Sequence, residues 1–289
     1  MAELPSHNWW ELRWKEIAAL DRSKTLVIQP TGAIEQHGPH LPLDVDIFNS
    51  SQIASRAVAR AREMGMESVF MAPPIWWGTS PHHLAFPGTI SLRMETMSDL
   101  LIDIASSFAA HGFYRILWLN GHGGNQGVLT ATALRCSEVV GITPAVVSYW
   151  QLIRDALREV GESANGGMGH ACEMETSIQL HLRGERVAME TASTDMPRQL
   201  TSYSCVDFRN SGPVMMPWDF LRDSKEGTMG DPMMASADKG RRIVEAAVDK
   251  VVDLSRELLA LRDDELLAGK AGRALEQEAK ARTAEGLPG

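Results

Sequence analysis

The sequence predicts an α/β protein, a three-layer α/β/α sandwich around a mostly parallel sheet. Short apolar runs rich in β-forming residues alternate along the chain with longer amphipathic runs, which is the rhythm of repeated βα units. The strand-like runs are apolar almost throughout, as expected of strands that helices cover on both faces. Right-handed crossovers would then join parallel neighbours. The expected strands span residues 25–30, 68–74, 114–120 and 144–150.

The amphipathic runs predict helices between these strands and after them, over residues 47–65, 94–112, 125–141 and 232–261. Residues 193–230 are irregular and rich in Pro, Gly, Asp and Ser, yet they contain aromatic side chains, so we expect an elaborate insertion rather than a linker. A single domain is therefore expected over residues 1–262. A charged, Ala-rich tail over 263–289 follows, which is helical by propensity.

The composition narrows the class of function. The 289 residues carry a formal net charge of -9 and no cluster of Lys or Arg, which argues against a nucleic-acid partner and favours a small-molecule substrate. No segment approaches the roughly 20 consecutive apolar residues of a membrane span, and the N-terminal residues lack the apolar run of a signal peptide. We therefore expect a cytoplasmic protein with no membrane partner. Cys136, Cys172 and Cys205 form no CxxC pair, so a disulfide framework or a cysteine-built zinc site is not expected.

Three polar clusters each follow a predicted strand. Glu35 and His37 are two residues apart, so an extended segment points both side chains the same way, and Asp46 follows after a proline-shaped loop. The second cluster is NGHGGN (120–125), and the third is GMGHACEMETS (167–177). Because the carboxyl ends of parallel strands share one edge of a sheet, the three clusters should converge there.

Together the clusters offer a mixed nitrogen and oxygen ligand set for a metal. Such ligands suit zinc, manganese or iron. In the third cluster, His170 and Glu173 are three apart, a spacing that places both on one face of a helix. Five ligands are too many for one catalytic metal with open positions, but suit two divalent metal ions about 3.5 Å apart that share a carboxylate and a bridging hydroxide. The expected ligands are Glu35, His37, Asp46, His122 and Glu173.

Each cluster alone also has a simpler interpretation. Glu35 and His37 could belong to a capped turn, and HACEMETS (170–177) could be the polar face of a surface helix. NGHGGN could cradle a phosphate with backbone N–H groups, although the GxGxxG spacing is absent. Cys172 could be a nucleophile, but a small buried side chain is the commoner role of a free cysteine.

Six motifs, in order, resemble those of the creatininase (creatinine amidohydrolase) family over roughly residues 10–255: EQHGPHLPLDVD, FPGTISL, NGHGGN, SYW, HACEMETS and GDPMMASADKGR. The resemblance implies a metal-dependent amidohydrolase on an α/β/α fold, a homohexamer with a dinuclear metal site. It implies Glu35, Asp46 and His122 as ligands of one metal. Ligands of the other would be His37, Asp46 and a further Glu, with Asp46 bridging.

The chain departs from creatininase proper at that further Glu. Creatininase reads NGHYEN, and the glutamate of that motif binds the second metal, whereas Gly124 stands here. Relatives with NGHGGN carry a glutamate in the HAGE motif instead, which corresponds to Glu173. The resemblance also implies His170 as the catalytic histidine and proton shuttle, and Glu175 is expected to orient it or a ligand.

The substrate site differs as well. Trp150 matches one of the two tryptophans with which creatininase holds its ligand, whereas the other falls on Gly166, so the hydrophobic lid is missing. Trp77, next to Trp76, is expected to help build a different pocket wall with His82 and His83, unless the two tryptophans are core residues. His83, which precedes FPGT, is a candidate substrate contact.

The sequence thus predicts a hydrolase that cleaves the C–N bond of a cyclic or small amide with a hydroxide bridging two metals, zinc being the first choice. Two alternatives stay open. A dinuclear site of this kind could hydrolyse another bond, in a cyclic ketone, a lactone or a nucleotide-derived formamide. A protein of another class, a non-catalytic nucleotide or anion binder, could use NGHGGN alone.

Overall fold

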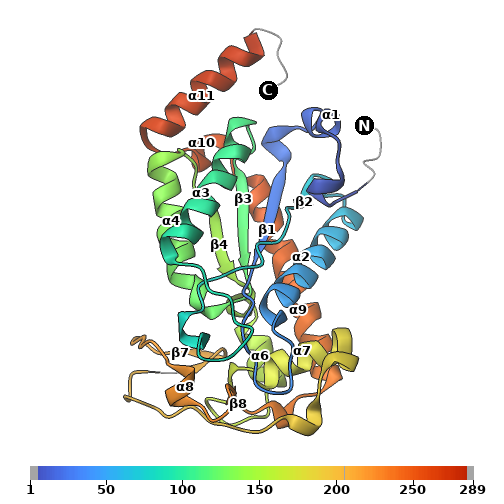
Figure 1. Cartoon of the computed structure of the whole chain (residues 1–289). Coiled ribbons are helices and arrows are strands. Elements are labelled where there is room, and N and C mark those ends of the chain that lie inside the picture. The colour runs from blue at the N-terminus through green and yellow to red at the C-terminus, as the bar shows by residue number, and fades with distance from the viewer. Residues whose placement is uncertain (1–5, 205, 285–289) are drawn as a thin grey trace.

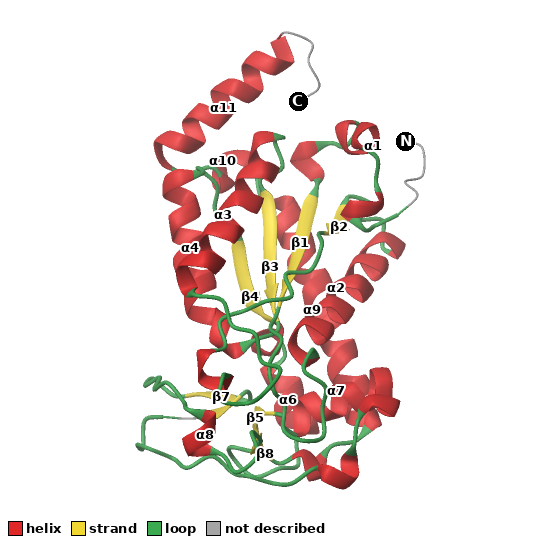
Figure 2. Cartoon of the chain, viewed as in Figure 1, coloured by secondary structure: helices red, strands yellow, loops and turns green. Residues whose placement is uncertain are grey.

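The fold is built on a four-stranded parallel sheet, seen in a computed structural model that describes residues 6–204 and 206–284. The sheet order is β2-β1-β3-β4. All neighbours are parallel, so every strand ends at the same edge, toward which the arrows point in Figure 2. The strands are β1 (Leu26–Thr31), β2 (Val69–Met71), β3 (Arg115–Asn120) and β4 (Ala145–Ser148).

Helices cover both faces of this sheet, which confirms the predicted three-layer α/β/α sandwich (Figure 1). One layer consists of α2 (Val45–Glu63), α5 (Tyr149–Leu152), α6 (Arg154–Val160), α7 (Glu173–Arg183) and α9 (Ala237–Ala260). The other contains α3 (Met94–Ala110) and α4 (Gln126–Val139). The short helix α1 (Trp14–Ala18) precedes the sheet, and α10 (Asp263–Leu266) and α11 (Gly269–Ala284) follow α9.

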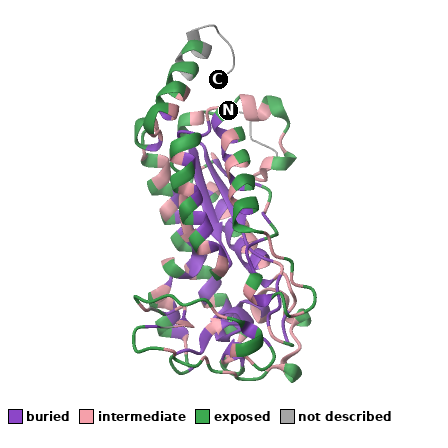
Figure 3. Ribbon diagram, turned by 60° about the vertical axis from the view of Figure 1, so that its left-hand side comes forward, coloured by how far each residue is buried: buried purple, intermediate pink, exposed green. Residues whose placement is uncertain are grey.

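Side-chain alternation along the strands divides the core into two clusters. Leu26 and Ile28 of β1 pack with the α2 and α9 layer, whereas Val27 between them packs with the α3 and α4 layer. Successive side chains of a strand point to opposite faces, so a strand covered on both faces must be apolar throughout. Figure 3 shows the consequence, because β1, β2 and β3 are buried along their whole length, whereas β4 is only partly buried before Ser148.

The last predicted strand is shorter than expected. β4 ends at Ser148, and the Tyr149 and Trp150 that were expected to continue it form the first turn of α5. The long C-terminal helix also begins later: a 3-10 turn, η7 (Pro232–Met234), comes first, and the Ser236 side chain then caps α9 by accepting a hydrogen bond from Lys239 N–H.

The irregular segment 193–230 folds below the carboxyl ends of the strands (Figure 1). It contains β6 (Val206–Asp207), β7 (Asn210–Ser211), α8 (Phe220–Asp223) and β8 (Met229–Gly230). β8 pairs antiparallel with β5 (Met168–His170), which anchors the end of the segment next to the third polar cluster. The expectation of an elaborated insertion fits this arrangement.

The C-terminal tail contacts the main body through its first residues. Leu266 is buried in the cluster of the α3 and α4 layer, and Leu275 of α11 packs against the same cluster. None of the helices in the described part of the chain has the length and apolar character needed to cross a bilayer. Cys136 and Cys172 are buried free thiols, whereas Cys205 lies outside the described residues.

Candidate metal centre

The first two polar clusters meet at the carboxyl edge of the sheet. Glu35 and His37 follow β1, Asp46 stands in the first turn of α2, and His122 follows β3. All four side chains are buried.

Close backbone contact fixes the start of α2 against the strand ends. Ser50 of α2 donates a hydrogen bond to the Thr31 carbonyl at the end of β1, and Gly121 N–H donates to the same carbonyl. A Cβ atom on Gly121 would collide with the Asp46 carbonyl. The first glycine of NGHGGN therefore allows the close approach that brings Asp46 beside His122.

Asp46 lies between two imidazoles. Its Oδ1 is 3.1 Å from His37 Nε2, and its Oδ2 is 2.9 Å from His122 Nδ1. Glu35 Oε1 is 3.3 Å from the same His122 nitrogen. Each oxygen of Asp46 faces a different histidine, which is the arrangement of a carboxylate able to bridge two cations.

Both histidines are oriented as metal ligands usually are. His37 Nδ1–H donates to the Glu35 carbonyl at 3.1 Å, and His122 Nε2–H donates to the Thr79 carbonyl at 3.1 Å. The other nitrogen of each ring then faces the carboxylates, in the position from which it could bind a metal. A backbone acceptor behind a histidine is the common way in which proteins fix the tautomer of a ligand.

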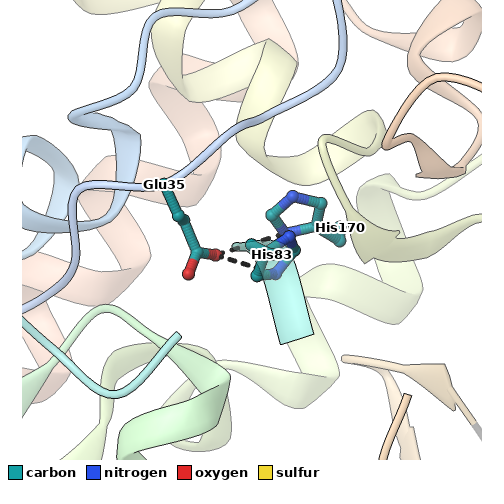
Figure 4. A group of neighbouring side chains, drawn as sticks. All are labelled: Glu35, His83 and His170. Carbon is teal, nitrogen blue, oxygen red and sulfur yellow. Dashed lines mark ion pairs between the residues drawn. The ribbon is translucent and has the colours of Figure 1, made fainter. Parts of the chain in front are cut away.

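Two more histidines extend the cluster beyond Glu35 (Figure 4). His83 Nε2 is 3.3 Å and His170 Nδ1 is 3.7 Å from Glu35 Oε1. The His83 ring accepts at Nδ1 from the Gln36 side chain, 2.7 Å away, so its Nε2 carries the proton and points it at Glu35. His83 is therefore placed as a hydrogen-bond donor at this site.

His170 also carries its proton on Nε2, but this proton is directed away from Glu35. Its Nε2–H donates to the Gln36 carbonyl at 2.8 Å, which leaves Nδ1 as the acceptor on the side of Glu35. Burial and the neighbouring His37 lower the pKa of His170 well below its usual value, so the ring is neutral. A neutral imidazole with a free nitrogen beside the cluster can accept a proton.

Glu173, expected as a ligand, lies elsewhere. Its carboxylate accepts hydrogen bonds from Glu162 N–H and Ser163 N–H, both at 3.0 Å, and from Lys239 Nζ at 2.6 Å. The expectation assumed helical spacing from His170, but α7 begins only at Glu173, and Ala171 before it has φ +51°. The chain reverses there, so the two side chains do not share a helix face.

Glu175, and not Glu173, lies beside His37 and His170. Its Oε1 lies 3.9 Å from His37 Nε2, and its carboxylate forms a possible ligand group with His37 and His170. Burial, opposed by the charge of His37, raises the pKa of Glu175 to about 7. A carboxylate two residues along the helix from the expected one therefore completes the cluster.

The same region explains the glycine that replaces the creatininase glutamate. A Cβ on Gly124 would collide with the His122 ring and the Thr79 carbonyl, and it would approach the His82 ring to 2.9 Å. His82 stacks on His122, with ring centroids 5.8 Å apart and an interplanar angle of 11°. His82 thus fills the space that a side chain at position 124 would need.

The charges of the buried side chains favour the binding of a cation at this site. Burial alone would disfavour a charged His37, but Asp46, Glu175 and Glu35 outweigh it and raise the pKa of His37 to about 9. Burial likewise opposes a charged Asp46, yet His37 and His122 hold the pKa of Asp46 well below its usual range. Both oxygens of Glu35 and Oδ2 of Asp46 are buried without a well-aligned hydrogen bond, although histidine nitrogens lie close to Glu35 Oε1 and Asp46 Oδ2. Buried carboxylates of this kind are satisfied by cations, so the residues present fit divalent metals.

The tryptophans differ in exposure, and the substrate contacts expected of Trp150 and Trp77 stay predictions. Trp150 is buried in the core against Tyr149 and Phe208, with ring centroids 5.2 and 4.9 Å away. Trp76 and Trp77 are each 48% exposed, so they are not core residues. Gly166 has φ +93°, a conformation that a tryptophan would adopt only with strain.

Sequence reasoning missed two residues at the site. The Gln36 side chain links His83 to the Gly227 carbonyl, which it reaches at 3.0 Å. Phe220 packs its ring on His83, His170 and His82. Gln36 adjoins two predicted ligands and could have been suspected, whereas Phe220 stands in the irregular segment, where no periodic pattern indicates which side chains turn inward.

Comparison with known proteins agrees with this geometry. The profile of the Creatininase family, described as creatinine amidohydrolase, matches residues 10–255. The mycofactocin precursor peptide peptidase of Mycobacterium tuberculosis is 35% identical over 237 residues, covering 78% of this chain and 82% of that protein. The 3-dehydro-scyllo-inosose hydrolase of Thermotoga maritima is 27% identical over 265 residues, covering 85% and 81%.

A solved structure of creatininase in a manganese form superimposes with a TM-score of 0.74 at 28% identity, covering 89% of this chain and 100% of that one. The buried cluster of histidines and carboxylates, together with this manganese form, supports divalent metal binding. These relatives are named as hydrolases or peptidases, and the profile covers most of the chain. The chain therefore belongs to the creatininase family and is a hydrolytic enzyme distinct from creatininase proper.

Proposed function

We propose that the protein hydrolyses the C–N bond of an amide at a site for two divalent metal ions. The observation that carries the proposal is the shared carboxylate, since Asp46 turns one oxygen to His37 and the other to His122. Glu35, Asp46 and His122 would hold one metal. His37, Asp46 and Glu175 would hold the other.

The metals, zinc or manganese by preference, would polarise the amide carbonyl and bring the pKa of a bridging water toward neutrality, so that hydroxide is available as the nucleophile. The chain supplies the remaining functions. His37 and His122 are locked in the ligand tautomer by the carbonyls of Glu35 and Thr79. Their fixed orientation lowers the cost of organising the site when the metals bind.

His170 is the proposed proton shuttle. Its Nδ1 can take a proton at the edge of the cluster and deliver it to the departing nitrogen, because its Nε2–H stays bonded to the Gln36 carbonyl throughout. His83 lies beside His170, with ring centroids 4.4 Å apart, and its Nε2–H makes it the proposed hydrogen-bond donor to the substrate. Glu175, expected to orient His170, serves in this proposal as a metal ligand.

The amide bond is proposed because two kinds of relative act on one. A peptidase and a creatininase lie among the similar proteins, and a peptide bond and the creatinine ring both contain an amide C–N bond. Cyclic and small linear amides are both compatible with the site. A cytoplasmic homohexamer remains the expected assembly.

The test compares metal-depleted protein with protein reloaded with Zn²⁺ or Mn²⁺ on a panel of creatinine, hydantoin, acetamide and glycylglycine. We expect hydrolysis of at least one amide by the reloaded protein, and its loss in Asp46→Asn together with the metal. Full hydrolysis by the metal-depleted protein would contradict the proposal.

A second bond type has a specific observation in its favour, since the Thermotoga relative is named as the hydrolase of an inosose. The same panel should therefore include a cyclic ketone and a lactone. Metal-dependent cleavage of one of these, with every amide left intact, would keep the metal centre and replace the amide by that bond. A nucleotide-binding role has less support, because it leaves the buried Glu35, His37 and Asp46 beside His122 without a function.

A further inference from the structure

Phe220 is a buried aromatic residue in an otherwise exposed apolar segment. Its neighbour Leu221 is 67% exposed and Met215 is 87% exposed, whereas Phe220 itself is only 4% exposed. The ring has therefore left the surface of the segment and turned toward the protein interior. The residues that contact the Phe220 ring therefore indicate its role.

The ring lies on the histidines of the metal centre. Its centroid is 4.0 Å from that of His83, 4.7 Å from that of His170 and 5.8 Å from that of His82. The interplanar angle with His83 is 32°, so the two rings partly stack, and His170 meets it edge-on at 66°. The donor and the proton shuttle of the proposed site thus share one aromatic wall.

The backbone of α8 fixes this position. Asp219 caps the helix by accepting hydrogen bonds from Leu221 N–H and Arg222 N–H, and Ser224 N–H closes the turn on the Phe220 carbonyl at 3.2 Å. Beyond α8, the Gly227 carbonyl accepts from the Gln36 side chain, which itself touches His83. The hydrogen bond at Gly227 therefore holds the irregular segment 193–230 next to the metal centre, close to Phe220.

Neither of the two positions that correspond to the creatininase tryptophans places an aromatic ring beside His83 and His170. Trp150 is in the core, and position 166 is a glycine in a left-handed conformation. Phe220 is thus the aromatic side chain that lies against both the proposed substrate donor, His83, and the proposed proton shuttle, His170. Aromatic faces attract planar π-groups in stacked or edge-on geometry.

We infer that Phe220 is a specificity-determining residue, whose ring forms the wall beside His83 and His170 and selects substrates with a planar aromatic or unsaturated group next to the scissile carbonyl. The inference rests on the proposed function and deepens it by naming a substrate class. It concerns binding, so it is testable before the natural substrate is identified.

The experiment uses two metal-binding probes that differ by one aromatic ring, acetohydroxamate and benzohydroxamate. Their dissociation constants are measured by calorimetry on zinc-reloaded wild type, Phe220→Ala and Phe220→Leu, with metal content determined for each. Leu221→Ala is the matched control, because Leu221 is the exposed neighbour on the same helix. Phe220→Leu retains apolar volume without the aromatic face and provides a folded variant if Phe220→Ala is unstable.

Wild type and Leu221→Ala should prefer benzohydroxamate, and the preference should fall about three- to ten-fold in both Phe220 variants. Acetohydroxamate affinity and metal content should stay unchanged. An equal preference in all four proteins overturns the inference while leaving the proposed metal centre intact. Failure of both probes to bind metal-loaded wild type overturns the proposed function and, with it, this inference.

Discussion

Lys239 forms an ion pair with Glu173, and this contact holds the Glu173 carboxylate away from the proposed metal centre. Its ammonium group contacts Glu173, Glu162 and the Met234 carbonyl, and the Glu173 side chain is fully buried. Removing the lysine leaves a buried carboxylate without its cation, which costs about 3 kcal/mol. We predict that Lys239→Ala lowers the free energy of unfolding by that amount in urea denaturation. Lys250→Ala, at an exposed position of the same helix, should have little effect, and equal effects of both would refute this role.

His40 should make the stability of the metal-free protein depend on pH. Burial and the nearby His37 lower the pKa of His40 to about 4, and its Nε2 shares a hydrogen bond with Thr176. A histidine whose pKa falls on folding stabilises the fold above its unfolded pKa of about 6.5, and this contribution is lost as pH falls toward 4. We predict that His40→Gln makes the free energy of unfolding less dependent on pH between 6.5 and 4. The exposed His111 serves as control, and a His40→Gln curve parallel to that of His111→Gln would contradict the assignment.

The sequence allowed four of the five proposed ligands to be named, but it indicated Glu173 where we propose Glu175. Glu35 and His37, two apart on an extended segment, were placed by simple alternation. Glu173 and Glu175 could not be separated in this way, because the choice depends on where α7 begins and on the turn at Ala171. Helix starts are set by local hydrogen bonding and are uncertain by one or two residues. An error of two residues is therefore enough to assign Glu173, the ion-pair partner of Lys239, in place of Glu175, the proposed metal ligand.

At the scale of elements, α7 and α9 pack closely at Gly240. A Cβ atom there would collide with the Ser177 carbonyl of α7. Gly→Ala in an open helix position stabilises by about 0.5–1 kcal/mol, whereas overpacking costs about 1–3 kcal/mol. We predict that Gly240→Ala destabilises the protein in urea denaturation, and that Gly127→Ala in α4, where nothing lies within 4 Å, stabilises it. Stabilisation by both substitutions would show that the helices separate without cost.

The strands β1, β2 and β3 were predicted within a few residues because they are buried on both faces, so each belongs to a mostly apolar run. β4 was overextended for the same reason. Tyr149 and Trp150 are apolar and buried, and apolar character alone does not distinguish the end of a strand from the first turn of a helix that follows it.

For the whole molecule, the parallel sheet explains why the first two polar clusters, far apart in the sequence, could be assigned to one site, whereas the third cluster follows β5 of a separate two-stranded sheet. Every strand ends at the same edge, so Glu35, Asp46 and His122 had to converge once the βα rhythm was recognised. The contribution of residues 193–230 could not be predicted in this way. Phe220 and the Gly227 carbonyl reach the centre through irregular backbone, which has no period that sequence reasoning could use.

We propose that Glu175, and not Glu173, completes a site for two metals. The most direct measurement is the zinc content per chain of wild type, Glu175→Gln and Glu173→Gln after reloading and removal of free metal. The two variants are matched, since each exchanges one buried carboxylate for an amide of the same shape. The account predicts close to two zinc ions in wild type and in Glu173→Gln, and close to one in Glu175→Gln. Loss of a metal from Glu173→Gln, with Glu175→Gln unchanged, would contradict it.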